Sequence, residues 1–156
     1  MERCQRIINH PLYRDCMSRI EGAESERIFC LHGLPHLLDT ARIGYIFILE
    51  RGLKIDKALY YAAALLHDSG RYNPIIDDHA EASAINAELI MPDCGFDEEE
   101  TETVARAIRS HRKGSAEDEF GAVLYEADKK SRMCFDCRAA AECYWDDEIR
   151  NNRIEV

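Results

Sequence analysis

The sequence has almost none of the signals that predict β-structure. It shows no sustained alternation of polar and apolar residues, and no Asn-Gly or Asp-Gly turn joins two β-branched runs. Long apolar runs are missing too, since the longest covers nine residues, 58–66, whereas a membrane span needs roughly 20. Charged residues interrupt the first twenty positions, which argues against a secretory signal. We therefore expect an all-α, cytoplasmic protein without a membrane span.

Excess positive charge is also absent. The formal net charge of −10 argues against a nucleic-acid or anionic membrane surface as a partner, because phosphate groups require a positive field. It is still compatible with a small phosphorylated substrate held by a few local Arg and Lys residues. The seven cysteines are an odd number in a chain without an export signal, so we expect reduced thiols or metal ligands rather than disulfides. Nothing in the sequence indicates an oligomeric state.

Helical periodicity is the main pattern that the sequence does contain. We expect residues 1–156 to form a single compact domain of about six helices, with a core over about 30–132 and a cysteine-containing segment over 133–156. The helix start and stop signals predict helices over 2–21 with a break near His10-Pro11, from Pro35 to about Glu50 before Gly52, from the Asp56 cap to His67, from the Asp77 or Asp78 cap to about Met91-Pro92, from Asp97 to His111, and from about Glu117 to beyond Arg132.

An adjacent pair, His67-Asp68, ends the long apolar run. Burying an imidazole and a carboxylate costs several kcal/mol unless something compensates them, and a bound cation is the usual compensation for neighbouring His and Asp. Adjacent helical residues point about 100° apart, so two neighbouring ligands can share an ion only at a helix end, where this pair lies. Further candidate ligands lie on or beside apolar helical segments: His36, His79, His111 and Asp128.

The order of these residues resembles that of the HD-domain metal-dependent phosphohydrolases over roughly residues 30–132. The motif is a His that opens one helix, an adjacent His-Asp pair that ends a later helix, and an Asp on a helix near the C-terminus. These elements correspond here to residues 36–42, 64–71 and 126–130. The resemblance implies a helical bundle with a metal site at its centre. The first metal would then be held by His36, His67, Asp68 and Asp128.

Some branches of this family hold two metals, with two further histidines as ligands and the Asp of the pair as a bridge. The resemblance places His79 and His111 in these positions, although each is also compatible with a hydrogen-bonded core histidine or a phosphate contact. The donor set suits one or two divalent transition metal ions, Fe, Mn, Co, Ni or Zn. Arg71 stands where nucleotidase and alarmone-hydrolase branches carry a Glu. This departure favours a two-metal mechanism on a phosphoester or phosphoanhydride.

Asp68 and Asp128 are the expected catalytic residues, because ionised carboxylates at the metal can steer a metal-activated water or take its proton. Five basic residues close to the expected ligands in sequence are candidates for binding substrate phosphate: Arg71, Arg112, Lys113, Lys129 and Arg132. Basic residues are also common at solvated helix ends, which is the alternative for each of them. His32 lies one turn before His36; it could line the mouth of the site, but we expect it on the surface.

A cysteine cluster follows the last predicted helix. Cys134, Cys137 and Cys143 form a C-x2-C-x5-C pattern, and Cys30 is the first candidate for a fourth ligand. Thiolates spaced in this way can share zinc or an iron–sulfur cluster. The alternative is that these cysteines pack as small apolar side chains.

Two functions from different classes fit these patterns. The first is a metal-dependent phosphohydrolase that acts on a small phosphorylated molecule such as a nucleotide. The second is a non-catalytic regulatory HD module that senses a nucleotide, a metal or redox state. The complete set of metal ligands favours the enzyme, because a binding module does not need carboxylates that activate water. The cysteines and the missing Glu favour the regulatory module.

Overall fold

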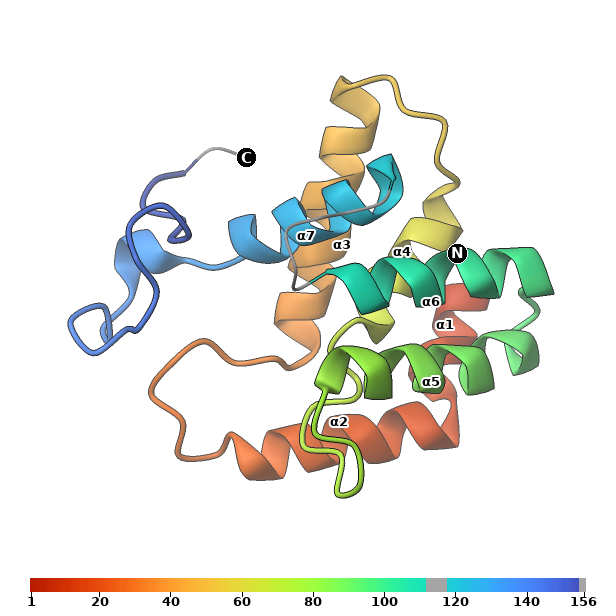
Figure 1. The fold of residues 1–156 in the computed structure, drawn as a ribbon, viewed down its shortest axis with the longest axis horizontal. Helices are drawn as coiled ribbons and strands as arrows, with labels where there is room; N and C mark the ends of the chain where they lie inside the picture. The colour runs from red at the N-terminus through yellow and green to blue at the C-terminus, as the bar shows by residue number, and fades with distance from the viewer. Residues whose placement is uncertain (112–117, 155–156) are drawn as a thin grey trace.

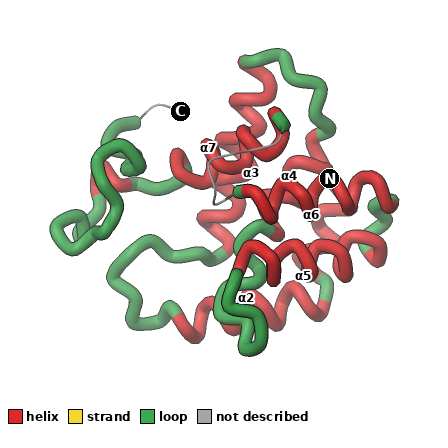
Figure 2. The backbone as a smooth tube through the Cα atoms, viewed as in Figure 1, coloured by secondary structure: helices red, strands yellow, loops and turns green. Residues whose placement is uncertain are grey.

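The computed structural model describes residues 1–111 and 118–154, which contain helices and loops and no strand (Figures 1 and 2). The expected all-α fold is confirmed. The described helices are α1 (Glu2–Asn9), α2 (Pro11–Ala23), α3 (Leu34–Glu50), α4 (Lys57–Leu66), α5 (His79–Asp93), α6 (Glu98–Ser110) and α7 (Glu119–Lys130), followed by the short 3-10 helix η1 (Cys134–Asp136).

The described helices exceed the expected six because the break at His10-Pro11 separates α1 from α2. His10 is extended, with φ −66° and ψ 132°, and its ring accepts a hydrogen bond from the Leu12 amide. A residue before proline is driven away from helical geometry, and Pro11 is suited to the first turn of the next helix. The chain therefore ends one helix and caps the next at the same residue.

Helix α4 lies at the centre of the bundle and packs against α1, α3, α5, α6 and α7. Residues 62–66 of this helix are at most 1% exposed, which explains why its sequence is apolar on every side. Asp56 begins the helix by accepting a hydrogen bond from the Leu59 amide at 2.9 Å. The last turn of α4 consequently delivers its next two residues, His67 and Asp68, to the middle of the molecule.

The turn that follows α4 lies directly against α5. A Cβ at Gly70 would come within 2.3 Å of the Ser83 backbone nitrogen, and the Gly70 amide donates to Ser83 Oγ at 2.8 Å. Only a residue without a side chain allows this approach. The small residue thus fixes the turn containing Asp68 against the helix that begins with His79.

Helix α7 ends earlier than expected. Its last residue is Lys130, so the prediction that it continues beyond Arg132 is wrong. The Ser131 hydroxyl donates to the Asp128 carbonyl at 2.7 Å, and Arg132 Nη1 donates to the carbonyl of Leu31 at 3.0 Å. These bonds replace the next helical turn. The predicted start at Glu117 lies just outside the described residues, and Asp118 caps the helix.

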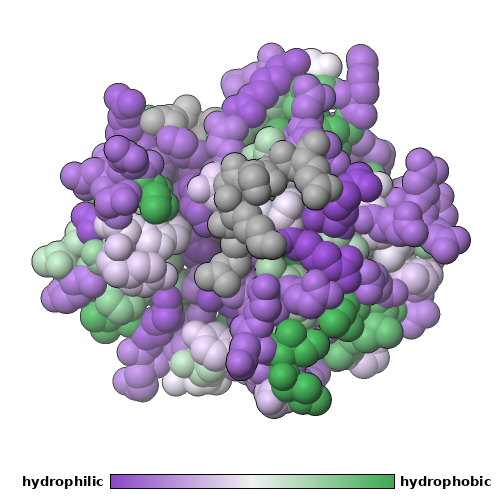
Figure 3. Space-filling view, viewed as in Figure 1, coloured by the Kyte–Doolittle hydropathy of each residue, from purple (hydrophilic) through white to green (hydrophobic). Residues whose placement is uncertain are grey.

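The side chains that cover most of the face in Figure 3 are hydrophilic, with hydrophobic ones gathered near its lower edge. None of the helices in the described part of the chain is both long enough and apolar enough to cross a bilayer. After η1 the described chain continues as turns and loops to residue 154, to one side of the helices (Figures 1 and 2).

Candidate metal centre

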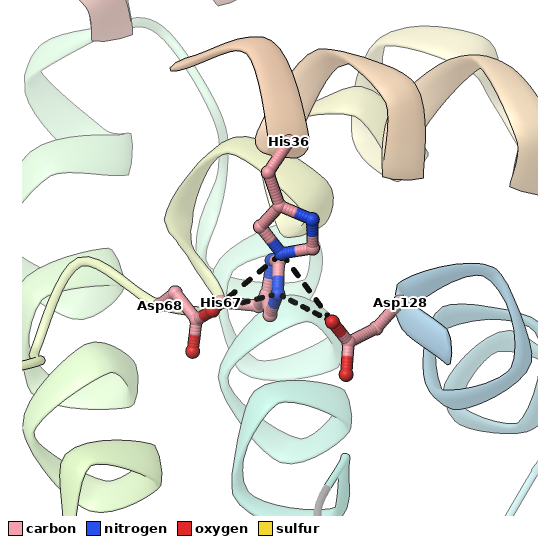
Figure 4. Close-up of side chains that lie close together, drawn as sticks. All are labelled: His36, His67, Asp68 and Asp128. Atoms are coloured by element: carbon pink, nitrogen blue, oxygen red, sulfur yellow. Dashed lines mark ion pairs between the residues drawn. The ribbon is translucent and has the colours of Figure 1, made fainter. Parts of the chain in front are cut away.

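Three helices bring the expected first-metal ligands together at the centre of the bundle. His36 lies in the first turn of α3, His67 and Asp68 follow the end of α4, and Asp128 lies in the last turn of α7. One ligand atom from each of the four lies within 4.8 Å of those from the others. Figure 4 shows the side chains pointing toward a common centre. All four residues are buried, so water does not compensate their polar groups.

Nitrogen and oxygen atoms alternate around this centre. His36 Nε2 lies 3.3 Å from Asp128 Oδ1 and 3.6 Å from Asp68 Oδ2. His67 Nε2 lies 3.4 Å from Asp68 Oδ2 and 3.7 Å from Asp128 Oδ1 (Figure 4). The four side chains face one another although His36 and Asp128 are 92 positions apart in the sequence.

Hydrogen bonds on the far side of each imidazole orient the histidines. His67 Nδ1 lies 2.8 Å from the Ala64 carbonyl, and His111 Nδ1 lies 2.5 Å from the Ile108 carbonyl. His36 Nδ1 lies 2.9 Å from Ser131 Oγ, whose hydroxyl is already donated to Asp128. Each Nδ1 is therefore the donor, so each Nε2 faces the centre, where it can carry a proton or bind a metal ion. Metal-binding histidines use this arrangement.

A second group of ligand atoms adjoins the first. Asp68, His79 at the start of α5 and His111 after α6 also lie within 4.8 Å of one another. Asp68 Oδ1 is 3.4 Å from His79 Nε2 and 4.0 Å from His111 Nε2. The other oxygen of Asp68 faces His36 and His67. The two groups therefore share Asp68, with a different oxygen directed at each.

The charges at the centre influence one another strongly. Burial by itself would lower the pKa of His67 and raise those of Asp68 and Asp128. The attraction between these opposite charges reverses all three effects: it raises the pKa of His67 to about 9 and holds both carboxyl pKa values well below their usual range. Burial and the neighbouring His67 lower the pKa of His111 to about 4. The centre thus has ionised carboxylates that favour a cation beside them.

The residues fit a divalent transition metal. The donors are imidazole nitrogens and carboxylate oxygens, which such ions prefer. His67 Nε2 is fully buried, lies between two carboxylates and has no hydrogen-bond partner among the described residues. A buried lone pair in this position requires either a proton or a metal ion. The set could hold one ion at each of its two groups.

Three of the five candidate phosphate-binding residues lie at this centre. Arg71 Nε is 2.9 Å from Asp68 Oδ1, and Lys129 Nζ is 2.6 Å from Asp128 Oδ2. Arg132 is 5% exposed, and its Nη2 lies 3.1 Å from Asp128 Oδ1. The remaining two, Arg112 and Lys113, lie outside the described residues.

A small cavity of about 60 Å³ opens beside the centre. Its basic lining residues are Arg27, Arg71, Lys129 and Arg132, and its aromatic ones are Phe29, Tyr144 and Trp145; His32, Cys30, Cys143 and Asp128 complete the lining. Lys129 Nζ lies 5.1 Å from the centre of the Trp145 ring. Sequence reasoning missed the aromatic residues and Arg27, because they come from segments without a motif.

The expectation that His32 lies on the surface is wrong, since the residue is 4% exposed. Its ring is held by Glu24, with 2.5 Å between His32 Nδ1 and Glu24 Oε1, and its backbone amide donates to Glu24 Oε2 at 2.7 Å. The one sequence feature that indicated a buried position for His32 was its spacing of one turn from His36. Its buried carboxylate partner is eight residues away, on a turn that the sequence does not predict.

The four expected cysteine ligands come close to one another from separate segments. Cys30, Cys134, Cys137 and Cys143 are free thiols of intermediate exposure that line one cavity of about 30 Å³. In the described part of the chain their sulfur atoms do not form a group as close as the His and Asp groups. The prediction that they bind a metal stays a prediction.

Comparison with known proteins agrees with this geometry. The family model of the HD domain matches residues 33–133. A Clostridium beijerinckii protein, described as uncharacterized, is 36% identical over 157 residues, which cover 99% of both chains. Ribonuclease Y of Borreliella burgdorferi and of Borreliella afzelii are each 32% identical over 93 residues, or 60% of this chain.

The chain spans 17% of the length of each of these ribonucleases. No solved structure matches the chain. The family match covers about two thirds of the sequence and includes all four residues of the first ligand group. The protein therefore belongs to the HD-domain family.

Proposed function

We propose that this protein is a metal-dependent phosphohydrolase that acts on a small phosphorylated molecule such as a nucleotide. One observation carries the proposal: Asp68 directs Oδ2 at His36 and His67 and Oδ1 at His79 and His111. A carboxylate placed between two sets of imidazoles could help to hold a metal ion at each set, and such ions would supply activation of water and polarisation of a phosphoryl oxygen. The HD-domain family, which consists mainly of metal-dependent hydrolases, supports the same reaction class.

The first ion would be held by His36, His67, Asp68 and Asp128, and the second by Asp68, His79 and His111. Iron, manganese, cobalt, nickel and zinc all suit this donor set. When bound, such an ion lowers the pKa of water and polarises a phosphoryl oxygen.

The protein supplies the remaining parts of the reaction. Asp68 and Asp128 are held ionised, so they can accept a hydrogen bond from the attacking water and fix its direction. Lys129 Nζ lies 2.6 Å from Asp128 Oδ2, and this ion pair restricts rotation of the Asp128 carboxylate. The burial of all four first-group residues excludes bulk water and strengthens these electrostatic interactions.

The lining of the adjacent cavity supports a phosphorylated aromatic substrate. The chain carries a net charge of −10, yet four basic side chains meet beside the metal centre. This local positive field suits a phosphate group during its transfer. Phe29, Tyr144 and Trp145 line the same cavity, and their rings can stack against a nucleobase.

The proposal is tested by metal analysis and a phosphate-release screen. Wild-type protein loaded with Mn²⁺, Fe²⁺, Co²⁺ or Ni²⁺ is assayed with nucleoside mono-, di- and triphosphates and with sugar phosphates. We expect Asp68→Ala to abolish both metal binding at the centre and hydrolysis. The matched control is Asp15→Ala, which removes an exposed carboxylate on α2. Full activity of Asp68→Ala would refute the assignment of the site.

The screen also separates two other functions. The ribonuclease Y relatives carry a name that implies RNA as a substrate, so a short RNA is included among the substrates. Because of the net negative charge, we expect it to be cleaved more slowly than a mononucleotide. Metal-loaded protein that binds nucleotides without turning them over would instead favour the regulatory module, to which the four clustered cysteines would then contribute.

A further inference from the structure

Four of the seven cysteines gather at one place although one of them, Cys30, is far from the other three in the sequence. Cys30 lies between α2 and α3, Cys134 begins η1, and Cys137 and Cys143 follow it. More than 100 residues separate the first from the second. The remaining three, Cys4, Cys16 and Cys94, are buried elsewhere among the helices.

These four thiols surround a common space. They line a cavity of about 30 Å³ together with Phe29, Ala140, Arg150 and Asn152, which exceeds the roughly 10–15 Å³ that one water molecule needs. All four are free. Burial raises the pKa of the Cys30 thiol, and the neighbouring Cys134 and Cys137 raise it further.

Positive charge is also present at this cavity. Arg150 donates from Nη2 to the Cys143 carbonyl at 2.9 Å, and its buried Nε has no hydrogen-bond partner among the described residues. Arg132 lowers the pKa of Cys30, against the effect of burial. A divalent ion with four thiolates carries a net charge of −2, which nearby guanidinium groups offset.

The segment that contains three of these cysteines has little hydrophobic core of its own. Among residues 133–154, Ala139 and Asn151 are the buried ones in the described part. The large side chains of Met133, Phe135, Tyr144, Ile149 and Ile154 are exposed. A segment that buries so little apolar surface needs another source of stability, and a structural metal is a common one.

We propose that Cys30, Cys134, Cys137 and Cys143 bind one zinc ion, which fastens the C-terminal segment to the chain before α3. Four S–H bonds break, four Zn–S bonds form, and the protons pass to the solvent. The sulfurs are farther apart than the His and Asp ligand atoms, so the thiol side chains rotate into the cavity to reach about 2.3 Å from the ion. C-x2-C spacing with a closed set of four ligands is typical of structural zinc.

The proposed zinc ion would also influence the shape of the cavity beside the metal centre. Cys30 and Cys143 line both the cysteine cavity and the one beside the metal centre. The same ion would thereby fix Phe29 on one wall and Trp145 on another, since each lies one or two residues from a ligand. This consequence depends on the proposed function, whereas the zinc site itself does not.

The test measures zinc in protein whose catalytic centre is disabled. Asp68→Ala protein, purified without chelator, is expected to retain one zinc per chain by mass spectrometry of metals. The same protein carrying Cys134→Ser and Cys137→Ser is expected to lose it. The control is Cys16→Ser, which removes a cysteine in α2 outside the cluster and leaves a hydroxyl that can accept from Asn86.

A second measurement does not depend on a variant folding. Cobalt is introduced into the wild-type chain, and thiolate-to-cobalt charge-transfer absorption is expected, since four sulfur ligands give intense bands that imidazole and carboxylate do not. An organomercurial should abolish these bands. Absence of zinc from Asp68→Ala together with absence of the bands would overturn the proposal, as would iron with acid-labile sulfide in place of zinc. Zinc retained at the cysteines, together with a wild-type protein that hydrolyses none of the assayed substrates, would support this site and count against the proposed function.

Discussion

Arg132 donates a hydrogen bond to His36, with 2.8 Å between Nη2 and Nε2. The same nitrogen lies 3.1 Å from Asp128 Oδ1 and 3.9 Å from Asp68 Oδ2. These acceptors are the atoms that a first metal ion would use. A guanidinium group and a first metal ion would therefore compete for one set of ligands, and we expect Arg132 to turn away on metal binding, toward the cavity that it also lines.

Replacing this arginine should separate the two roles. Arg132→Gln is expected to raise the affinity for the first metal about tenfold, or about 1.4 kcal/mol, because the competing charge is gone. It should raise KM for the phosphorylated substrate, because one phosphate contact is lost. Calorimetric titration with Mn²⁺ and steady-state kinetics measure the two effects. The control is exposed Arg138→Gln, and unchanged values of both constants for Arg132→Gln would contradict the interpretation.

The second ligand group can be removed without touching the first. His79→Ala should reduce the metal bound at the His and Asp centre from two ions to one, since His79 faces Asp68 Oδ1 at 3.4 Å and belongs only to the second group. Turnover is expected to fall on the order of a hundredfold or more, the usual effect of losing an electrostatic contributor to the transition state. Metal analysis after desalting gives the stoichiometry. Two ions in the variant besides the zinc proposed at the cysteines would show that His79 is not a ligand.

Glycine at position 70 is expected to be indispensable for the centre. In Gly70→Ala the new Cβ meets the Ser83 backbone at 2.3 Å, so the turn holding Asp68 must shift, at a cost of about 1–3 kcal/mol. Thermal unfolding and metal affinity should both report the change. Gly22→Ala in α2 is the matched control, because its Cβ would meet nothing within 4 Å. Gly22→Ala should stabilise the protein by about 0.5–1 kcal/mol. Equal effects of the two substitutions on stability would exclude a steric clash at Gly70 as the cause.

Stability should fall as the pH drops below about 6.5, and His32 should contribute to the fall. Burial lowers the pKa of His32 to about 3 from 6.5 in the unfolded chain. Between these values the unfolded chain binds a proton that the folded one does not, so protonation favours unfolding. Hydrogen bonds from His32 also lower the pKa of Glu24 despite its burial, which adds stability that is lost at still lower pH.

This pH dependence is checked by chemical denaturation at pH 7.5, 6 and 5. His32→Asn keeps a donor for Glu24 but does not titrate, so its free energy of unfolding should change less between these values than that of the wild type. If the free energy of unfolding falls equally with pH in the wild type and in His32→Asn, the pH dependence comes from other groups.

Trp145 should contribute to the binding of nucleotides and contribute little to the binding of substrates without an aromatic base. In Trp145→Ala we expect a KM for a nucleotide about tenfold higher, since stacking contributes about 1–3 kcal/mol per base. KM for a sugar phosphate should change little. The control is Phe135→Ala, an exposed aromatic side chain in the same segment that does not line the cavity. Equal losses for both substrates would argue for a change in the shape of the centre rather than for stacking.

Local chemistry explains why the helices and the ligands could be predicted. Asp56 and Asp97 cap helices where the sequence indicates, because a carboxylate just before a helix satisfies its free amides whatever the rest of the chain does. His67 and Asp68 stood out because polar side chains after a buried helix need compensation. Their convergence with His36 and Asp128 was inferred from the order of the motif, and the packing of α3 and α7 on α4 brings it about.

Other features depended on contacts that have no local signature. The early end of α7 follows from bonds that Ser131 and Arg132 make to distant partners, and the burial of His32 follows from a turn that returns Glu24 to it. Sequence alone determined that the chain is helical and which polar side chains would need compensation when buried, since periodicity and the cost of burying charge are local properties. Tertiary structure decided which oxygen of Asp68 faces which histidines and which thiols share a cavity, because these relationships exist only once separate helices and loops are packed together.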